Sequence, residues 1–458
     1  MDKRQILVVG NGMVGQRFVD KFLAWDTAGT CDITVVGEES RPAYDRVALT
    51  SWFNGRTEAD LSLVDDALLA GDRVDYRLGQ RVVEIDTVSR KATLDDGSMH
   101  GYDELVIATG SAPFVPPIPG HDLDGCFVYR TIEDLERIKS WATAPGRATG
   151  LVIGGGLLGL EAANALRSLG LDVHVVEMAP YPMPQQLGEG GGRMLGRWVD
   201  SLGVQLHCGV APHHFLDDGS GSVAGLQMSD GTAYPSDIVV FSAGVRPRDD
   251  LARRSGIDVG ERGGIVVDDT LQTSADHVWA IGEVALHGGR VYGLVAPGYE
   301  MAAALAERLA DDGGAPVYRG SDLSTKLKLL GVDVASFGQS NAGGDQIDEI
   351  VYNDPINKIF RRLALDATTG ALLGGAFVGD TSGYELLTAI TLGQATQPDD
   401  LPAYVLPSSV RPPDQGQLPD GALLCSCNAV SVGTIRRAVA DGCQTLGDVK
   451  SSTCAGTS

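Results

Sequence analysis

Two glycine-rich segments carry the clearest chemical signal in this amino-acid sequence. Each has the spacing Gly-x-Gly-x-x-Gly, directly follows a short apolar run (Ile6–Val9 or Leu151–Ile153), and precedes a stretch that reads as a helix. Such a turn lets the backbone approach a diphosphate closely and places that anion at a helix N-terminus. Two complete units in one chain therefore predict two dinucleotide-binding sites. The glycines are Gly10, Gly12 and Gly15 in the first segment and Gly154, Gly156 and Gly159 in the second.

An acidic residue follows the second strand of each unit, roughly 20 to 30 residues after the glycine-rich segment begins. Glu177 directly follows the predicted strand Asp172–Val176, where a carboxylate can accept hydrogen bonds from a ribose diol. No Arg or Lys lies within ten residues after Glu177, so a 2′-phosphate would lack a cationic partner and NADH is favoured over NADPH. In the first unit either Glu38 or Glu39 could be the ribose ligand, and the sequence does not choose between them.

The order of the two units indicates which nucleotide each one binds. Strands of the first unit are expected to resume after the second unit, at 237–242 and 278–280, as in flavoproteins that bind two dinucleotides. This arrangement predicts FAD in the first unit and NADH in the second.

The cysteines indicate how electrons could leave a flavin. No Cys-x4-Cys lies near the first unit and residues 40–50 contain no cysteine, so a dithiol relay and a single-thiol mechanism are both excluded. Four of the seven cysteines lie in the last 34 residues. Among them, Cys425 and Cys427 form a Cys-x-Cys pair, and thiolates are the ligands of iron–sulfur clusters. The pair is therefore a candidate metal site.

Length and composition place these sites in a protein of several domains. With 458 residues, 43% of them hydrophobic, the chain is too long for one core and predicts two to four domains. The net charge of −24 provides no electrostatic attraction to nucleic acid or to an anionic membrane. No apolar run of about 18 residues exists, and the N-terminus lacks a signal-peptide pattern. We therefore expect a cytoplasmic protein with neither nucleic acid nor membrane as a partner.

The predicted fold class is α/β, with tandem Rossmann-like domains of a two-dinucleotide-binding flavoprotein, a C-terminal α+β interface domain and a partial [2Fe–2S]-type tail. A segment rich in Pro, Asp and Gln separates the last two parts and reads as a linker. The expected parts are a discontinuous FAD-binding domain at 1–112 and 237–315, an NADH-binding domain at 113–236, an α+β domain at 316–396, a linker at 397–420 and a truncated [2Fe–2S] module at 421–458.

Seven short motifs between the first glycine turn and Asp333 form a family signature. They are Gly10–Gly15, Ala43–Val47, Gly154–Glu161, Gly244–Arg248, Ala280–Glu283, Gly293–Tyr299 and Lys326–Asp333. Together they resemble the large subunit of bacterial NADH-dependent assimilatory nitrite reductase, and the resemblance covers essentially the whole chain. The last two motifs separate this family from generic flavin reductases.

The resemblance implies a set of cofactor ligands. Glu161 would face the nicotinamide–flavin junction as the candidate catalytic residue, although a carboxylate stabilised by the helix dipole is an equally simple explanation. Glu283 stands at the ribityl chain, where related flavoproteins carry Asp, and Ser51 stands where ferredoxin reductases carry a lysine. FAD would be held by Gly10, Gly12, Gly15, Glu38 or Glu39, Arg46, Ala108, Thr109, Gly110, Gly282 and Glu283, and NADH by Gly154, Gly156, Gly159 and Glu177.

The tail departs from the family pattern. The family's [2Fe–2S] module has a Cys-x-Cys pair, matched by Cys425 and Cys427, and a later Cys-x-x-Cys pair. The sequence stops at Ser458, where that second pair should begin, so we expect a truncated chain with an incomplete cluster. The alternative is that Cys443 and Cys454, which do not fall on ligand positions of the family, replace the missing pair.

The resemblance thus implies an NADH-oxidising flavin reductase that forms the electron-entry part of an assimilatory nitrite reductase. Electrons would pass through FAD to iron–sulfur and sirohaem centres of a reductase module that the family carries on the same full-length chain and that is absent here. A small subunit is a further expected partner. The alternative among enzymes is a stand-alone NADH:ferredoxin- or rubredoxin-type reductase, and the alternative outside enzymes is a flavin-binding sensor or scaffold.

Overall fold

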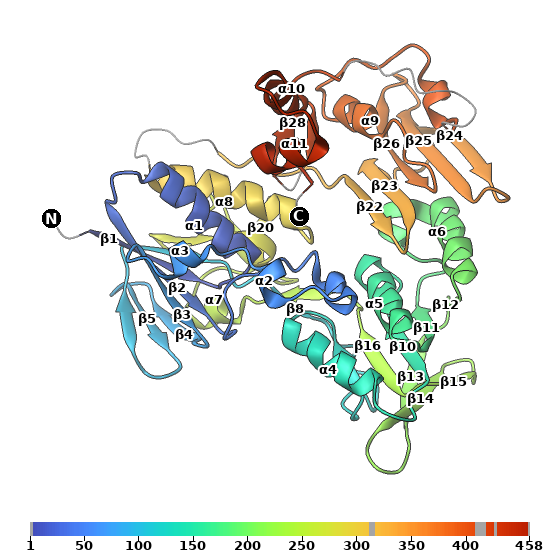
Figure 1. Cartoon of the computed structure of the whole chain (residues 1–458), viewed down its shortest axis with the longest axis horizontal. Helices are drawn as coiled ribbons and strands as arrows, with labels where there is room; N and C mark the ends of the chain where they lie inside the picture. Colours follow the sequence, from blue (N-terminus) through green and yellow to red (C-terminus); the bar gives the residue numbers. More distant parts are fainter. Residues whose placement is uncertain (1–2, 311–316, 408–417, 426–427, 457–458) are drawn as a thin grey trace. The chain divides into compact units, whose positions relative to one another are not determined.

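Two units, each assembled from two separate stretches of the chain, make up the protein in the computed structural model (Figure 1). The structure describes residues 3–310, 317–407, 418–425 and 428–456. The first unit combines Met1–Ala112 with Val245–Asp322, and the second combines Pro113–Gly244 with Leu323–Thr457. Each unit contains a five-stranded parallel sheet, which confirms the predicted α/β class with tandem Rossmann-like domains.

The sheet of the first unit has the strand order β19-β7-β1-β2-β3. Its central strand β1 is buried along Ile6–Val9 on both faces, as expected of a parallel sheet covered on both sides. The helices α1 and α8 pack side by side in this unit (Figure 1). The main elements are β1 (Arg4–Val9), α1 (Met13–Trp25), β2 (Cys31–Gly37), η1 (Leu49–Asn54), β3 (Val74–Leu78), β7 (Glu104–Ile107), β19 (Val278–Ala280) and α8 (Val295–Ala310).

Shorter elements complete the first unit and reach its boundary with the second, which falls within β8. They are α2 (Glu58–Leu61), α3 (Asp66–Leu69), β4 (Val82–Asp86), β5 (Lys91–Leu94), β6 (Met99–Gly101), β8 (Ser111–Pro113), β17 (Val245–Pro247), α7 (Asp250–Arg254), β18 (Ile265–Val267), η2 (Gly282–Val284), β20 (Ala285–His287) and β21 (Arg290–Val291).

The second unit contains a parallel sheet of order β12-β11-β10-β16-β9 and a three-stranded antiparallel sheet. Residues of both sheets share one apolar cluster, which includes Leu151, Val176 and Phe215. The elements are β9 (Cys126–Val128), α4 (Ile132–Ala142), β10 (Thr149–Ile153), α5 (Leu157–Ser168), β11 (Asp172–Glu177), α6 (Pro184–Ser201), β12 (Val204–Cys208), β13 (Pro212–Asp217), β14 (Val223–Met228), β15 (Ala233–Pro235) and β16 (Ile238–Phe241).

The expected domain boundary at residue 237 needs correction. Strand β16 does not return to the first sheet, because it pairs in parallel with β10 of the second sheet, Gly150 opposite Ile238. The first unit resumes only at Val245, and its returning strand is β19. Since β16 is a fully apolar run like the strands of both sheets, its composition could not reveal its sheet.

A third lobe, residues 323–407, belongs to the second unit and is built on an antiparallel sheet of order β22-β23-β26-β25-β24. Its core includes Phe337, Leu363 and Phe377, with α9 packed on β23 and β26. Helix α6 packs against the same sheet. The elements are β22 (Thr325–Leu329), β23 (Val332–Gly338), β24 (Ile347–Asp354), β25 (Ile359–Asp366), β26 (Leu372–Val378), α9 (Tyr384–Thr391) and η3 (Leu401–Val405).

The first part of the expected linker at 397–420 is folded, which corrects that expectation. Leu401 and Val405 are buried in the core of the third lobe. The carbonyl oxygen of Tyr404 accepts a hydrogen bond of 2.8 Å from the buried guanidinium of Arg361. Two apolar residues four positions apart therefore anchor a segment whose Pro and Asp content had indicated a linker.

A small module follows, consisting of β27 (Leu423–Cys425), β28 (Val430–Ser431), α10 (Val432–Ala440) and α11 (Leu446–Thr453). Its residues Ala422 and Val432 share an apolar cluster with Ala389 of α9. Of the helices in the described residues, none combines the length and the hydropathy needed to cross a lipid bilayer.

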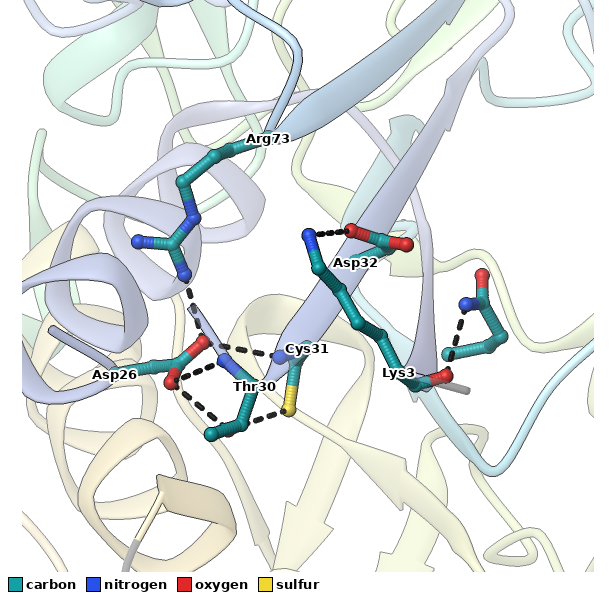
Figure 2. A network of polar contacts seen from close by, with 7 residues as sticks. Lys3, Asp26, Thr30, Cys31, Asp32 and Arg73 are labelled. Atoms are coloured by element: carbon teal, nitrogen blue, oxygen red, sulfur yellow. Dashed lines mark hydrogen bonds and ion pairs between the residues drawn. The ribbon is translucent and has the colours of Figure 1, made fainter. Parts of the chain in front are cut away.

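A buried carboxylate fastens the end of α1 to the strands that follow it (Figure 2). Asp26, the residue after α1, accepts hydrogen bonds from the backbone N–H and the hydroxyl of Thr30, at 2.9 and 2.8 Å, and from the N–H of Cys31. Arg73, just before β3, donates at 2.7 Å to Asp26 Oδ2, the oxygen that also accepts from Cys31. Burial opposes the charged form, but these donors outweigh it and lower the pKa of Asp26 below 3.8.

We expect the substitution Asp26→Asn to destabilise the chain by about 2 kcal/mol, because an amide group would face donors that need an acceptor. A carboxylate whose pKa falls on folding stabilises above its unfolded pKa, and that contribution disappears as the pH drops through the folded pKa. Urea unfolding should therefore show a smaller difference from wild type at pH 3 than at about pH 6.

The matched control is Asp32→Asn, since Asp32 pairs only with Lys3 in Figure 2 and both side chains are more than 40% exposed. It should unfold close to wild type. Equal effects of the two substitutions would contradict the role given to Asp26.

Candidate functional site

The first glycine turn is shaped by two contacts that only glycine permits. Gly10 has φ +118°, and a Cβ on it would lie 2.2 Å from the carbonyl oxygen of Ala108. A Cβ on Gly15 would lie 2.2 Å from the carbonyl oxygen of Gly10. Around a Cβ on Gly12, by contrast, no described atom outside its two chain neighbours lies within 4 Å. The turn therefore packs tightly at its first and third glycines and is open at its second.

The second turn repeats this pattern. Gly154 has φ +115°, and its Cβ would lie 2.3 Å from the carbonyl oxygen of Ser242. A Cβ on Gly159 would lie 1.9 Å from the carbonyl oxygen of Gly154. Gly156 again has no described atom within 4 Å of its Cβ position apart from those of its two chain neighbours. The turns Gly10–Gly15 and Gly154–Gly159 thus have the same shape, although their neighbours differ. We call each turn, together with the helix start that follows it, a cradle.

Each cradle has the chemistry needed to hold a diphosphate. The open glycines Gly12 and Gly156 are the N-cap residues of α1 and α5, and within the described residues no side chain caps either helix start. The first backbone N–H groups of both helices are therefore available to an anion, with the helix dipoles aligned to favour it. The residues present fit a dinucleotide in each unit.

The two units place their carboxylates differently, although the strands have the same register. Gly10 N–H donates to Val36 O, and Gly154 N–H donates to Val176 O, both at 2.8 Å. Glu177, the residue after Val176, accepts hydrogen bonds from the N–H groups of Gly155 and Ala179 at 2.7 and 2.8 Å.

The equivalent position in the first unit is Gly37, so neither Glu38 nor Glu39 occupies the register position of Glu177. A Cβ on Gly37 would lie 2.6 Å from the Cβ of Asn11, whereas a Cβ on Gly155 would lie 2.9 Å from the Cβ of Glu177. The larger side chain thus stands on the turn in the first unit and on the strand in the second. This exchange explains why the acidic residues of the first unit lie beyond the strand end.

The two candidate ribose ligands have different partners. Glu39 accepts a hydrogen bond of 2.7 Å from the hydroxyl of Tyr44 and forms an ion pair with Arg46. Glu38 pairs with Arg248 at 2.7 Å, and the hydrogen bond from Arg248 lowers the pKa of Glu38 against the opposing effect of burial. Glu39 is therefore engaged by the loop that carries Arg46, while the Glu38 side chain, just past the end of β2, is the more exposed of the two, at 41% against 22%.

Arg46 lies next to the first glycine turn. Its backbone N–H donates to the sulfur of Met13, the first residue of α1, and its guanidinium lies 4.9 Å from the centre of the Tyr44 ring. Burial favours the neutral form, but Tyr44, Glu39 and Glu283 raise the pKa of Arg46, which stays protonated. The loop is fixed by the buried Asp45, whose Oδ1 accepts hydrogen bonds from the backbone N–H groups of Val47 and Ala48.

The remaining candidates of the first unit lie at the carboxyl ends of β7 and β19. Ala108 contacts Gly10 as described, Thr109 donates through Oγ1 to Arg248 O at 2.9 Å, and Gly110 O accepts from Arg248 N–H at 2.9 Å. Gly282 has φ +80° and packs on Val14 of α1.

Glu283 accepts a hydrogen bond of 2.5 Å from Ser111 Oγ. Because parallel strands all end at the same edge of their sheet, the candidates of the first unit lie together around one turn.

Two residues of this site were not predicted as ligands or supports, Tyr44 and Arg248. Both lie inside motifs of the family signature, but nothing in their spacing indicates what they touch. Arg248 is 210 residues away from its ion-pair partner Glu38, and Tyr44 reaches Glu39 only because the intervening loop folds back.

Glu161 belongs to the second unit and lies in the second turn of α5, half-buried and two residues after Gly159. Its role at a nicotinamide stays a prediction.

The three single cysteines are poor thiolates. Burial raises the pKa of Cys31, that of Cys126 to about 12, and that of Cys208 to about 11, where the charge of Glu177 adds to the effect. Thiols with such pKa values remain protonated at neutral pH. They offer no nucleophile or redox pair to either cradle.

The described residues of the tail do not provide a ligand set for a [2Fe–2S] cluster. Cys425 Sγ accepts a hydrogen bond from Gly456 N–H at 3.4 Å, and Cys443 Sγ lies 3.4 Å from Ser452 Oγ. Among the described residues, no three or more Cys, His, Asp or Glu side chains are close enough together to hold a metal ion. Cys427 lies outside the described residues, so the Cys425–Cys427 pair stays a prediction.

Comparisons with known proteins match this architecture part by part. Residues 4–306 match the pyridine nucleotide-disulphide oxidoreductase family, residues 324–392 the rubredoxin NAD+ reductase C-terminal domain, and residues 423–458 the BFD-like [2Fe–2S] binding domain.

Individual relatives extend these matches. The nitrite reductase [NAD(P)H] large subunit of Klebsiella oxytoca is 44% identical over 461 residues, covering 100% of this chain and 48% of that protein. The rubredoxin-NAD(+) reductase of Alcanivorax borkumensis is 30% identical, covering 82% of this chain and 95% of that protein. A ferredoxin reductase structure from Rhodopseudomonas palustris superposes with a TM-score of 0.78 at 25% identity, covering 89% of this chain and 98% of that one. The chain thus spans about half the length of the nitrite reductase subunit it matches.

Substitution of the open and the closed glycines should separate ligand binding from folding. Gly156→Ala places a methyl group in free space, so the chain should unfold like wild type while its affinity for NADH falls about tenfold or more. Gly159→Ala would create the 1.9 Å conflict with Gly154 O and should destabilise the second unit. Thermal unfolding and NAD+ titration measure the two effects.

Gly196→Ala is the control, because its Cβ would lie inside α6 at an ordinary 3.5 Å from Leu206. It should leave both the thermal unfolding of the chain and its affinity for NAD+ unchanged. A Gly156→Ala chain that binds NAD+ as tightly as wild type would contradict the assignment of the second cradle.

Proposed function

Since the chain belongs to the pyridine nucleotide-disulphide oxidoreductase family, we propose that it is an NADH-oxidising flavin reductase, the electron-entry part of an assimilatory nitrite reductase. The observation that carries the proposal is the pair of matching glycine cradles, one in each parallel sheet of a single chain. The similarity to a nitrite reductase large subunit, which extends over 100% of this chain, supports the choice of pathway.

FAD is assigned to the first cradle. The N–H groups at the start of α1 would hold its diphosphate, and Arg46 would supply the neutralising cation. Thr109 and Gly110 fix the loop at the carboxyl end of β7, while Glu283, together with Gly282, follows β19. We assign the ribose diol to Glu38, because both oxygens of Glu39 are engaged by Tyr44 and Arg46.

NADH is assigned to the second cradle. The N–H groups at the start of α5 would hold the diphosphate, and Glu177 would accept the ribose hydroxyls through the lone pairs that Gly155 and Ala179 leave unused. The absence of Arg and Lys from the ten residues after Glu177 supports NADH over NADPH.

Bound FAD supplies the chemistry, which is acceptance of a hydride from NADH and release of the electrons one at a time. The residues of the chain bind and orient the two nucleotides, and no side chain is required as an acid or base in hydride transfer itself. Glu161 is assigned to the nicotinamide end of the second cradle, which its place in the second turn of α5 supports.

The proposed electron acceptors are iron–sulfur and sirohaem centres of a nitrite-reducing module, with a small subunit as a further partner. The match of residues 423–458 to a BFD-like [2Fe–2S] binding domain supports an iron–sulfur acceptor. No electron-transfer step is assigned to Cys425, because its surroundings do not complete a ligand set within the described residues. The proposed location is the cytoplasm.

A second candidate is an NADH:rubredoxin- or ferredoxin-type reductase that serves a separate electron carrier. It is favoured by the match of the third lobe to the rubredoxin NAD+ reductase C-terminal domain. The choice of acceptor distinguishes the two candidates, since both share the hydride step.

The FAD-loaded chain should oxidise NADH with ferricyanide as acceptor, because ferricyanide takes electrons directly from a reduced flavin. It should produce no ammonium from nitrite, because nitrite reduction is assigned to the centres of the nitrite-reducing module. NADPH should be the poorer donor. The rate of ferricyanide reduction and an ammonium assay measure these outcomes. Nitrite turnover by this polypeptide alone, or an absence of NADH-dependent ferricyanide reduction, would refute the proposal.

The assignment of Glu38 predicts a selective loss. Glu38→Gln should weaken FAD binding about tenfold and leave FMN binding unchanged, since FMN lacks the adenosine ribose. Glu39→Gln should affect both flavins in the same proportion, because it releases Arg46. Fluorescence titration of the flavin-free chain with each flavin gives the dissociation constants for FAD and FMN, and hence their ratio in each variant. A change in the FAD-to-FMN ratio caused by Glu39→Gln and not by Glu38→Gln would reverse the assignment.

A further inference from the structure

The turn between β23 and β24 in the third lobe reaches the start of α6 in the nucleotide-binding part of the same unit. Asn341, in this turn, donates two hydrogen bonds through Nδ2, to the carbonyl oxygens of Pro184 and Gln185, both at 2.7 Å. These carbonyls belong to the first two residues of α6. One amide group thus fixes the N-terminal end of a helix that is 156 residues away in sequence.

The residue before α6 continues this connection to the second glycine turn. The N–H of Met183 donates to the carbonyl oxygen of Gly155 at 3.1 Å. Met183 is 2% exposed and has φ +49°, a conformation that a residue of its type adopts only when its surroundings impose it. Gly155 is also held through its N–H by Glu177 at 2.7 Å. Both polar groups of the peptide backbone of Gly155 are therefore restrained.

The turn that carries Asn341 is itself clamped from within the third lobe. The guanidinium of Arg362 donates through Nη1 to Ser340 O at 2.5 Å and through Nη2 to Ala342 O, the residues on either side of Asn341. Glu349 pairs with the same guanidinium at 2.7 Å. Because the Arg362 side chain is 11% exposed and its fork is rigid, Asn341 is presented in a fixed orientation.

Helix α6 is shaped to receive this turn. Gly188 interrupts the helix with φ +63°, and a Cβ on it would lie 2.9 Å from Asn341 Oδ1. Two residues later, a Cβ on Gly190 would lie 2.3 Å from the ring of Phe360 in β25. The glycine-rich start of α6 thus allows a close approach of the third lobe that any larger residue would prevent.

We propose that Asn341 is a positioning residue for the NADH site, acting through Pro184, Met183 and Gly155. Gly155 directly precedes Gly156, the open residue of the second cradle, so the orientation of the Gly155 carbonyl sets the direction of the N–H groups that follow. The third lobe then helps to set the affinity for NADH. This inference rests on the proposed assignment of NADH to the second cradle.

The test compares Asn341→Asp and Asn341→Ala with wild type by calorimetric titration with NAD+, which binds without reacting. Asn341→Asp keeps the shape, removes both donors and turns a carboxylate toward two carbonyl oxygens. It should weaken NAD+ binding about tenfold and Asn341→Ala about fivefold, because both variants lose the two hydrogen bonds and only the aspartate adds repulsion from the carbonyl oxygens. The FAD content and the rate of flavin reduction at saturating NADH should stay at wild-type values.

Asn353→Asp and Asn353→Ala are matched controls, since Asn353 is an exposed asparagine on β24 of the same lobe. They should bind NAD+ like wild type. The inference is overturned if Asn341→Asp binds NAD+ within twofold of wild type, or if it loses FAD in proportion to NAD+ affinity. A wild-type chain that binds no NAD+ would instead overturn the proposed function, so the two failures are distinguishable.

Discussion

In both parallel sheets, a carbonyl oxygen at the end of one strand lies so close to the first glycine of the neighbouring turn that no Cβ could fit between them. The contact joins Gly10 to Ala108 in the first unit and Gly154 to Ser242 in the second. It brings the end of the central strand, the turn and the helix start together, and it leaves the second glycine facing free space. The rest of each site is arranged around that opening, from the helix start to the acidic residue on the next strand in the second unit or just beyond that strand in the first.

The two cradles are equal in shape and differ in where their charged groups come from. In the second unit the carboxylate of Glu177 stands in the strand and fastens the turn directly. In the first unit Asn11 fills the corresponding room beside Gly37, and the charges come from loops that carry Glu38, Arg46 and Arg248. A site built from loops can be adapted to a larger cofactor such as FAD, whereas a site built on a strand end is more rigid.

The sequence was sufficient to predict the local features of this fold. The glycine spacing, the buried apolar strands and the helix after each turn are all short-range patterns, and the structure contains them. Sheet membership of β16 could not be predicted, because an apolar strand such as Ile238–Phe241 satisfies either sheet. The partners of Glu38, Glu39 and Asn341 could not be predicted either, since they depend on loops that meet only after the strands are paired. Leu401 and Val405 show the same limit, because two apolar residues in a polar segment indicate burial only once a core is available.

The central claim is that one chain holds FAD in its first cradle and accepts a hydride there from NADH held in its second. Anaerobic titration of the FAD-loaded chain with NADH, followed by the visible absorbance of the flavin, tests it most directly. The account predicts rapid bleaching that is complete at one NADH per bound FAD, and loss of this response in the Gly156→Ala chain at the same NADH concentrations. A flavin band that persists in excess NADH, or that bleaches equally well when Gly156 carries a side chain, would contradict it.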